Sequence, residues 1–316
     1  MNSGAYRPTL LAGCPAAAGS GQHQPNRKGR RGSDGPGNLL APMASHSKVR
    51  GAVRDLPEAD EIALAAAETF TSEYGDRTPA PVAVVIPALD EEESVAAVIS
   101  SVPREICGLK TETILVDDGS TDETSPRARA AGALVCRLPV NLGQGHAFRI
   151  GYKLATDRGA EVICTADADG QFDPRELPAL VAPILAGEAD FVNGSRRLGR
   201  TETTDPVRRA GVLVYGALVS VLTGVRITDP ANGLRAFRPA VTSTVPLRQT
   251  QYQTSELLIG AIAHGFRVIE APATMYQRVA GESKKGHNLI YGLRFGRVVV
   301  STWLDQRADA KRRARR

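Results

Sequence analysis

Runs of Val and Ile alternate with segments of helical pattern from residue 81 onward, and this alternation constrains the fold more than any other feature. The apolar runs are almost continuous, as in strands that are buried on both faces of a sheet. Strands and helices that alternate in this way form a mostly parallel sheet covered by helices on both faces. The expected strands carry the sequences PVAVVIP, TETILVDDGS, ALVCRLP, EVICTADADG and ADFVNGSR.

Polar clusters follow the expected strands at their carboxyl ends, and open α/β sheets bind their ligands at this edge. A dinucleotide-binding fold would need the glycine pattern G-x-G-x-x-G after the first strand. This chain has PALDE at 87–91 instead, and the later GQG at 143–145 lacks the third glycine. The sequence therefore indicates a ligand-binding α/β protein that is not a dehydrogenase.

Charge and composition divide the chain into four parts. Residues 1–50 carry seven Arg or Lys against one acid, and residues 307–316 carry six against one, so the middle of this chain of net charge +5 is acidic. An acidic middle argues against a nucleic-acid-binding core. We expect a disordered basic segment at 1–55, a short helical lead-in at 56–80, the main domain at 81–286, and an amphipathic, basic helix and tail at 287–316.

Five short motifs follow one another in a fixed order: VVIPALDEEE, ILVDDGSTDET, NLGQGHAFRIG, ADADGQFDP and GSR. Together they resemble the family-2 glycosyltransferases of the GT-A fold, over residues 81 to about 300. Two later segments, TDPANGLRAFRP at 228–239 and QRVAGESKKG at 277–286, resemble the branch of dolichol-phosphate mannose synthases and polyprenyl-phosphate glycosyltransferases. The resemblance implies a GT-A type, Rossmann-like α/β fold with a mostly parallel sheet, helices on both faces and a C-terminal amphipathic helix.

Asp167 and Asp169 stand two positions apart at the end of an apolar run. A hard divalent cation prefers oxygen ligands and keeps positions open for phosphate oxygens, so the two carboxylates fit Mg²⁺ or Mn²⁺. A solvated acidic turn is the alternative. The family resemblance adds Gln171 to the metal site and makes Asp169 a catalytic residue.

The resemblance also implies which residues bind the nucleotide sugar. Acids suit this task because the N–H groups of a base and the hydroxyls of a ribose donate hydrogen bonds. A helix-capping role is the alternative for Asp118, since DGSTDE resembles a capping box. The implied set is Pro87, Leu89, Glu91, Asp117, Asp118, Asp167, Ala168, Asp169, Arg196, Arg278 and Lys284.

Three members of that set are cations that match phosphate-contacting positions of the family: Arg196, Arg278 and Lys284. A guanidinium group binds phosphate oxygens in a fork, which suits a diphosphate. We expect Arg278 and Lys284 to be catalytic, because they would stabilise the departing diphosphate. A solvated basic loop is the alternative for these two residues.

Arg208 and Arg209 resemble the acceptor-phosphate arginines of the family, and Arg235 is placed with them in the acceptor site. The first two precede the apolar run 210–225, so a phosphate head with an isoprenoid tail would fit there. A core helix with two exposed arginines is the alternative. A hydroxyl acceptor would instead need a general base, and Asp229 is the candidate for that role.

The C-terminal segment 287–316 combines large apolar residues, Trp303 among them, with a basic tail. Such helices are typical of proteins that lie on anionic lipid. The longest uncharged run, 210–225, has 16 residues, fewer than the ~20 that span a bilayer. We expect a peripheral protein on the cytoplasmic face of the membrane, with a helix packed on the domain and a solvated tail as the alternative.

These features predict a metal-dependent, inverting hexosyltransferase. It would move a sugar from a UDP- or GDP-linked donor to a polyprenyl phosphate, with no nucleic acid as a partner. Two alternatives stay open: transfer to a soluble hydroxyl acceptor, and a nucleotide-sugar-binding protein without activity.

Overall fold

The computed structural model of the chain describes residues 56–202, 206–277 and 288–315. The expected disordered segment at 1–55 lies outside these residues. The described part contains one eight-stranded sheet. Its strands are β1 (Val82–Ala88), β2 (Glu105–Ile106), β3 (Leu109–Asp117), β4 (Leu134–Arg137), β5 (Val162–Thr165), β6 (Phe191–Thr201), β7 (Arg235–Phe237) and β8 (Val268–Met275).

The sheet is mostly parallel, as the near-continuous apolar runs predict. Its order is β2-β3-β1-β5-β7-β6-β8, and β4 also pairs with β3. Strand β7 is antiparallel to both of its neighbours, and β2 is antiparallel to β3. Because β7 runs the other way, the loop that leads into it arrives at the edge where β5 and β6 end.

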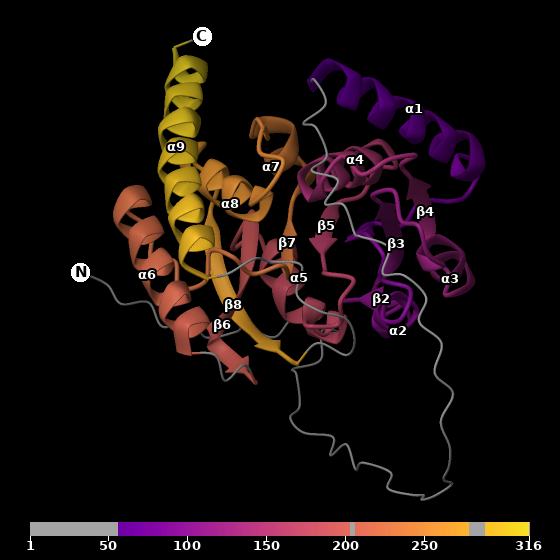
Figure 1. The fold of residues 1–316 in the computed structure, drawn as a ribbon, viewed down its shortest axis with the longest axis horizontal. Coiled ribbons are helices and arrows are strands. Elements are labelled where there is room, and N and C mark those ends of the chain that lie inside the picture. Colours follow the sequence, from indigo (N-terminus) through magenta and orange to yellow (C-terminus); the bar gives the residue numbers. More distant parts are fainter. Residues whose placement is uncertain (1–55, 203–205, 278–287, 316) are drawn as a thin grey trace, which may run out of the picture.

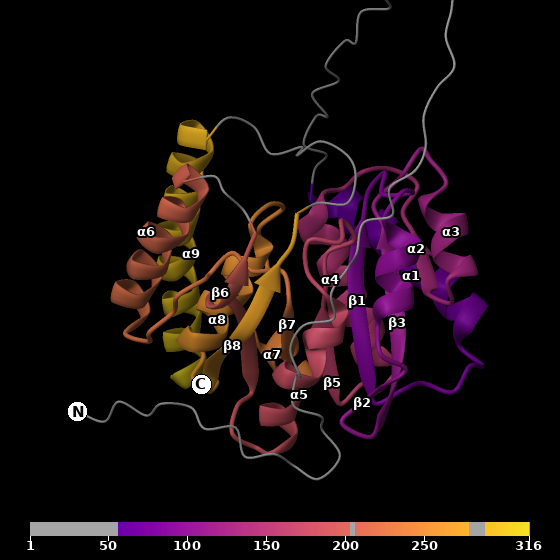
Figure 2. The ribbon, with the colours of Figure 1, turned by 90° about the horizontal axis from the view of Figure 1, so that it is seen from below.

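Helices cover both faces of the sheet (Figures 1 and 2). They are α1 (Leu56–Tyr74), α2 (Val95–Ser101), α3 (Thr124–Ala130), α4 (Gln144–Asp157), η1 (Pro174–Glu176, a 3₁₀ turn), α5 (Leu177–Leu185), α6 (Pro206–Thr223), α7 (Pro239–Thr244), α8 (Gln253–Ala263) and α9 (Asn288–Ala314). Alternate residues of each strand enter two separate cores. In β1, Ala83 and Val85 join the core under α1, α4 and α8, whereas Val82, Val84 and Ile86 join the core under α2, α3 and α5.

Helix α4 lies unusually close to the centre of the sheet because residue 151 is a glycine. A Cβ atom at Gly151 would stand 2.3 Å from Cγ1 of Val85, closer than real Cβ contacts allow. Only glycine therefore lets the helix backbone approach β1 at this point. This close packing fixes α4, whose first turn faces the ligand-binding edge.

Helices α6 and α9 lie side by side at one end of the molecule, far from α1 and α3 (Figures 1 and 2). Helix α9 packs on the domain through Val299, Thr302 and Gln306, which are at most 2% exposed. Trp303 also packs against the core under α8. Among the described residues, none of the helices has both the length and the apolar character needed to cross a bilayer.

Candidate active site

The loops after β1, β3 and β5 meet at one edge, because β1 lies between β3 and β5 in the sheet. This topology brings together most of the expected donor-site residues. Pro87 lies within β1, and Leu89 and Glu91 follow it. Asp117 ends β3, and the segment 167–171 follows β5.

Side chains of the β3 loop hold the backbone of the β1 loop. The N–H of Asp90 donates to Oγ of Ser120 at 2.9 Å, and the N–H of Glu91 donates to Oγ1 of Thr124 at 2.8 Å. In return, Oδ1 of Asp90 accepts from the N–H of Thr121 at 2.9 Å. The two loops that would frame a nucleoside therefore form one rigid unit.

Both acids at the end of β3 are buried and hydrogen-bonded. Asp117 accepts from the N–H of Ser120 at 2.7 Å and from the hydroxyl of Ser125. Asp118 accepts from the N–H groups of Leu142 at 2.8 Å and Gly143 at 2.9 Å. Asp118 thus holds the segment that begins α4, and its contact with a nucleotide stays a prediction.

Asp118 should make folding stability depend on pH. Burial raises the pKa of its carboxyl group from 3.8 to about 6, although the N–H groups of Leu142 and Gly143 oppose this rise. The folded state therefore holds a proton between pH 4 and 6 that the unfolded state has lost, so stability falls as pH rises through this window. Relative to Asp118→Asn, the wild type should lose up to about 3 kcal/mol of unfolding free energy between pH 4 and pH 7.

Urea unfolding at a series of pH values measures this difference. Asp122→Asn is the matched control: burial alone would raise the pKa of Asp122, but hydrogen bonds from Thr124 and from the backbone of Glu92 together hold it below its usual range. Relative to Asp122→Asn, the wild type should gain unfolding free energy as the pH rises. Parallel stability curves for wild type and Asp118→Asn would show that the Asp118 carboxyl titrates normally.

The segment after β5 carries the two acids of the expected metal site. Asp169 is 9% exposed, and its Oδ1 accepts from the N–H of Gln171 at 3.0 Å. The carbonyl of Gln171 accepts from the N–H of Tyr276 at 2.8 Å, directly after β8. The segment is thereby tied to the end of β8, which leads into the part of the chain that carries Arg278 and Lys284.

Gly233 lies directly against the other acid of this pair. A Cβ atom at Gly233 would stand 2.2 Å from Oδ2 of Asp167, so no other residue fits here without moving the carboxylate. The hydroxyl of Thr165 donates to the carbonyl of Gly233 at 2.6 Å. The loop that precedes β7 therefore lies against one side of the expected metal site.

The donor set fits Mg²⁺ or Mn²⁺. Within residues 56–202, 206–277 and 288–315, no group of three or more His, Cys, Asp or Glu side chains is arranged to hold a metal ion. Mg²⁺ commonly uses one or two carboxylates and completes its coordination with substrate phosphates and water. Asp167 and Asp169, with the amide of Gln171, supply that kind of partial site.

Arg196 and Asp229 form a buried, two-pronged ion pair. Nε and Nη2 of Arg196 each lie 2.6 Å from a carboxylate oxygen of Asp229. Burial alone would raise the pKa of Asp229, but hydrogen bonds and charge from Arg196 hold it below its usual range. A buried, paired carboxylate of low pKa supports the structural interpretation of Asp229 and not the role of general base.

Arg235 is 1% exposed, so the structure places it inside the protein and not at the surface. Its guanidinium donates to the carbonyls of Asn232, Pro230 and Thr254. Burial lowers the pKa of Arg235 to about 10, and the fall is opposed by Tyr152, Asp229, Asp167 and Glu270. The group thus remains a buried cation near three acids of the site.

The remaining cations of the expected site are only partly described. Arg209 is exposed near the start of α6, next to Arg208, whose side chain lies outside the described residues. Arg278 and Lys284 also lie outside them. The roles of these four residues stay predictions.

The sequence interpretation missed Glu270 and Asn193. Glu270 accepts from the N–H and the hydroxyl of Thr228 at 2.8 and 2.7 Å. Asn193, which is 0% exposed, donates to Glu270 at 3.2 Å. A single acid inside the apolar run VIEAPA was the available signal for this network.

Comparisons with known proteins agree with the fold. The model of the family described as glycosyl transferase family 2 matches residues 83–244. The structure is similar to glucosyl-3-phosphoglycerate synthase from Mycobacterium tuberculosis in complex with Mn²⁺, UDP-glucose and phosphoglyceric acid. The TM-score is 0.57 at 25% identity, covering 77% of this chain and 84% of that chain. This likeness confirms an α/β fold of GT-A type.

Two relatives cover most of the described domain. An uncharacterized protein of Methanocaldococcus jannaschii is 33% identical over 67% of this chain and 87% of its own length. A dolichyl-phosphate hexose transferase of Haloferax volcanii is 31% identical over 71% of this chain and 95% of its own length. The chain therefore belongs to glycosyltransferase family 2, a family of sugar-transferring enzymes.

Proposed function

We propose that the chain is a metal-dependent, inverting glycosyltransferase that moves a sugar from a nucleotide-diphosphate sugar to a polyprenyl phosphate. The observation that carries this proposal is the meeting of the Asp167–Asp169 segment with the two interlocked loops after β1 and β3. A cation site beside a nucleoside site is what a nucleotide-sugar donor requires. The similarity to a dolichyl-phosphate hexose transferase supports a lipid phosphate as the acceptor.

Asp167, Asp169 and Gln171 would hold the divalent cation, which when bound neutralises the charge of the departing diphosphate. The loops that carry Leu89, Glu91 and Asp118 would hold the base and ribose. Arg278 and Lys284 would bind the diphosphate as it leaves. Asp229 already engages Nε and Nη2 of Arg196, so contact between Arg196 and a donor phosphate would fall to Nη1.

Arg208 and Arg209 would position the acceptor phosphate near the carboxyl edge of the sheet. One phosphate oxygen of the acceptor attacks the anomeric carbon of the sugar. The bond between that carbon and the diphosphate oxygen breaks, the diphosphate leaves, and the configuration at the carbon inverts. A phosphate monoester is already an anion, so the reaction needs no general base. The burial of Asp229 in its ion pair agrees with this kind of acceptor.

A soluble acceptor is the second candidate. A solved structure relevant to it is that of glucosyl-3-phosphoglycerate synthase in complex with Mn²⁺, UDP-glucose and phosphoglyceric acid. A phosphorylated hydroxy acid also carries an anionic head that basic side chains could bind. In that case the acceptor hydroxyl would still need a base.

Labelled UDP- and GDP-sugars separate the two candidates. The protein is incubated with each donor and Mn²⁺, once with polyprenyl phosphate and once with 3-phosphoglycerate. Label that moves into the organic phase supports the lipid acceptor, and label in a soluble product supports the second candidate. Donor hydrolysis alone, with neither product, would contradict both acceptor assignments.

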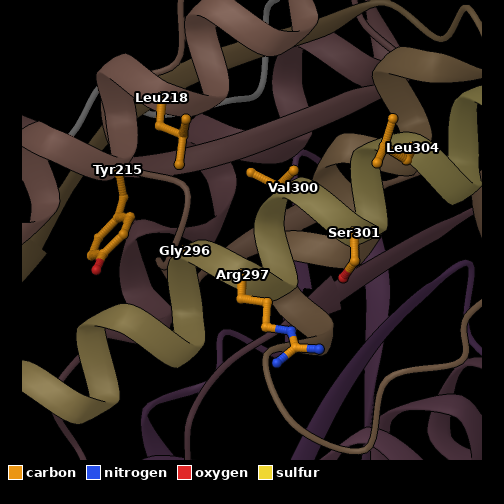
Figure 3. Close-up of a pocket in the computed structure, with 7 residues that line it drawn as sticks. All are labelled: Tyr215, Leu218, Gly296, Arg297, Val300, Ser301 and Leu304. Carbon is orange, nitrogen blue, oxygen red and sulfur yellow. The ribbon is translucent and has the colours of Figure 1, made fainter.

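We propose further that α6 and α9 rest on an anionic membrane surface at the cytoplasmic face. Both helices carry exposed apolar side chains: Leu213, Val214 and Val221 on α6, and Val300 and Leu304 on α9. Between the helices lies a groove of about 590 Å³, whose walls include Tyr215, Leu218, Val300 and Leu304 (Figure 3). An apolar stripe beside basic side chains is the pattern of an interfacial helix.

The basic side chains lie along the same helix pair. Exposed basic residues include Arg209 and Arg226 near the two ends of α6, and Arg297, Lys311, Arg312 and Arg313 along α9. Trp303 does not belong to this surface, because it packs inward and Arg307 lies over its ring at 5.1 Å. Lipid contact therefore depends on the aliphatic residues and the basic tail, not on the tryptophan.

Neutralising two basic residues of α9 should weaken binding to anionic vesicles. Each basic residue near such a surface contributes about 1 kcal/mol, so Lys311→Gln with Arg313→Gln should lower the partition coefficient roughly 30-fold. Sedimentation with phosphatidylcholine vesicles, with and without phosphatidylserine, measures it. The matched control neutralises Arg104 and Lys110, two exposed basic residues beside β2. Equal binding of both double variants would refute the α6–α9 surface.

A further inference from the structure

Four polar residues stand side by side across the carboxyl-end part of the sheet. The Cα register pairs Thr165 with Arg235, Arg235 with Asn193, and Asn193 with Glu270. Residues paired in register project from the same face of a sheet. We call these four residues the polar row. The strands that carry them are otherwise largely apolar, and buried polar groups of this kind require hydrogen-bond partners.

The partners are backbone groups of one loop, residues 228–233. Glu270 accepts from the N–H of Thr228 at 2.8 Å and from the N–H of Asp229 at 3.1 Å. Asn193 donates to the carbonyl of Asp229 at 2.8 Å. Two members of the polar row therefore hold the first half of the loop.

The other two members hold its second half. Arg235 donates to the carbonyl of Pro230 at 3.1 Å and to that of Asn232 at 2.9 Å. Thr165 donates to the carbonyl of Gly233 at 2.6 Å. Between them, the four side chains bind six backbone groups of a six-residue loop.

This loop contacts the candidate site at two points. Gly233 lies against the carboxylate of Asp167, which it would displace if it carried a Cβ atom. Asp229 pairs with Arg196 on β6. A shift of the loop would therefore change the position of a proposed metal ligand.

We propose that the polar row is a positioning device that holds the 228–233 loop in place and thereby fixes the carboxylate of Asp167 for the cation and the donor diphosphate. Glu270 is the positioning residue at its outer end, and Arg235 positions the loop and does not touch the acceptor phosphate. The inference rests on the proposed function, because it assumes that Asp167 is a metal ligand. Residues that orient metal ligands typically change metal affinity or activity by about 10- to 100-fold when they are replaced.

Glu270→Gln tests this role, because the amide has one acceptor oxygen where the carboxylate uses two. We expect Mn²⁺, titrated in the presence of UDP or GDP and followed by electron paramagnetic resonance, to bind about 10- to 100-fold more weakly than to wild type. Glu256→Gln is the matched control: Glu256 is 2% exposed and accepts from the N–H groups of Arg248 and Gln249 at 2.8 and 3.0 Å, and not from the backbone of the 228–233 loop. This control should bind Mn²⁺ as the wild type does.

A second pair of variants decides the matter if Glu270→Gln does not fold. Thr165→Val removes only the hydroxyl that binds Gly233, whereas Thr165→Ser keeps it. Thr165→Val should bind Mn²⁺ about 10-fold more weakly, and Thr165→Ser should restore the affinity.

Three results would contradict the positioning role of the polar row. A folded Glu270→Gln that binds Mn²⁺ as wild type does would overturn it, as would an equal loss in Glu256→Gln. Equal affinities of Thr165→Val and Thr165→Ser would do the same. If the wild type itself binds no Mn²⁺ with either nucleotide, the metal site of the proposed function is wrong, and the positioning role falls with it.

Discussion

Replacing Asp169 with alanine is expected to lower sugar transfer at least about 1,000-fold while the protein stays folded. The carboxylate would be a ligand of the cation that neutralises the leaving diphosphate, so its loss removes several kcal/mol of transition-state stabilisation. Asp169 is held within its own short segment, through the N–H of Gln171, and it lies outside the two apolar cores. The fold should therefore survive the change.

Transfer of labelled sugar at saturating donor measures the rate, and circular dichroism during heating checks the fold. Asp157→Ala is the control, because Asp157 is an exposed acid at the end of α4 that pairs with Lys153 at 2.6 Å. This variant should keep the wild-type rate. A wild-type rate in Asp169→Ala would contradict the assignment of Asp169 as a ligand of the cation.

Breaking the Arg196–Asp229 pair is expected to cost about 3–5 kcal/mol of unfolding free energy. The side chains are 10% and 0% exposed, so either partner alone would leave a buried charge without compensation. Arg196→Met and Asp229→Asn should each show this loss in urea unfolding. The double variant should lose less than the sum of the two single losses, because it leaves no buried charge behind.

Losses below about 1 kcal/mol in both single variants would place the pair among ordinary surface ion pairs. The same variants bear on the acceptor. If Asp229→Asn remains folded at low temperature and still transfers sugar, Asp229 is not the general base that a hydroxyl acceptor needs.

The alternation of strands and helices was predictable because central strands such as β1 and β5 are buried on both faces, which leaves continuous apolar runs in the sequence. The meeting of the loops after β1, β3 and β5 was also predictable in outline, since parallel strands present their carboxyl ends at one edge. The antiparallel direction of β7 was not predictable from the sequence. Its three residues, RAF, carry no directional signal, and the long connection through α6 would allow either direction.

The charged residues inside the sheet were the hardest part of the site to predict. Arg235 was placed in the acceptor site together with Arg208 and Arg209. Its true surroundings are backbone carbonyls of the 228–233 loop and of Thr254, which only the folded chain brings together. The same holds for Glu270, whose partner Thr228 is 42 residues away in the sequence.

The C-terminal helix shows how a pattern can be identified correctly while one residue is misplaced. Amphipathicity predicted a helix with an apolar stripe and a basic end, and α9 has both. Trp303 was expected on the lipid-facing side, but it packs on the domain. The helical spacing of apolar residues gives α9 two apolar stripes, one through Val299 and Trp303 and one through Val300 and Leu304. That spacing does not tell which of the two stripes packs on the domain.

The hydrogen bonds that hold the 228–233 loop decide which of its positions can be substituted without moving the backbone. Within this loop, all of which the structure describes, Ala231 is the single residue whose side chain is exposed. The backbone on either side of it is hydrogen-bonded, so a larger side chain at this position would project into solvent and leave the loop in place. We therefore expect position 231 to tolerate a larger side chain better than its neighbours in the loop do.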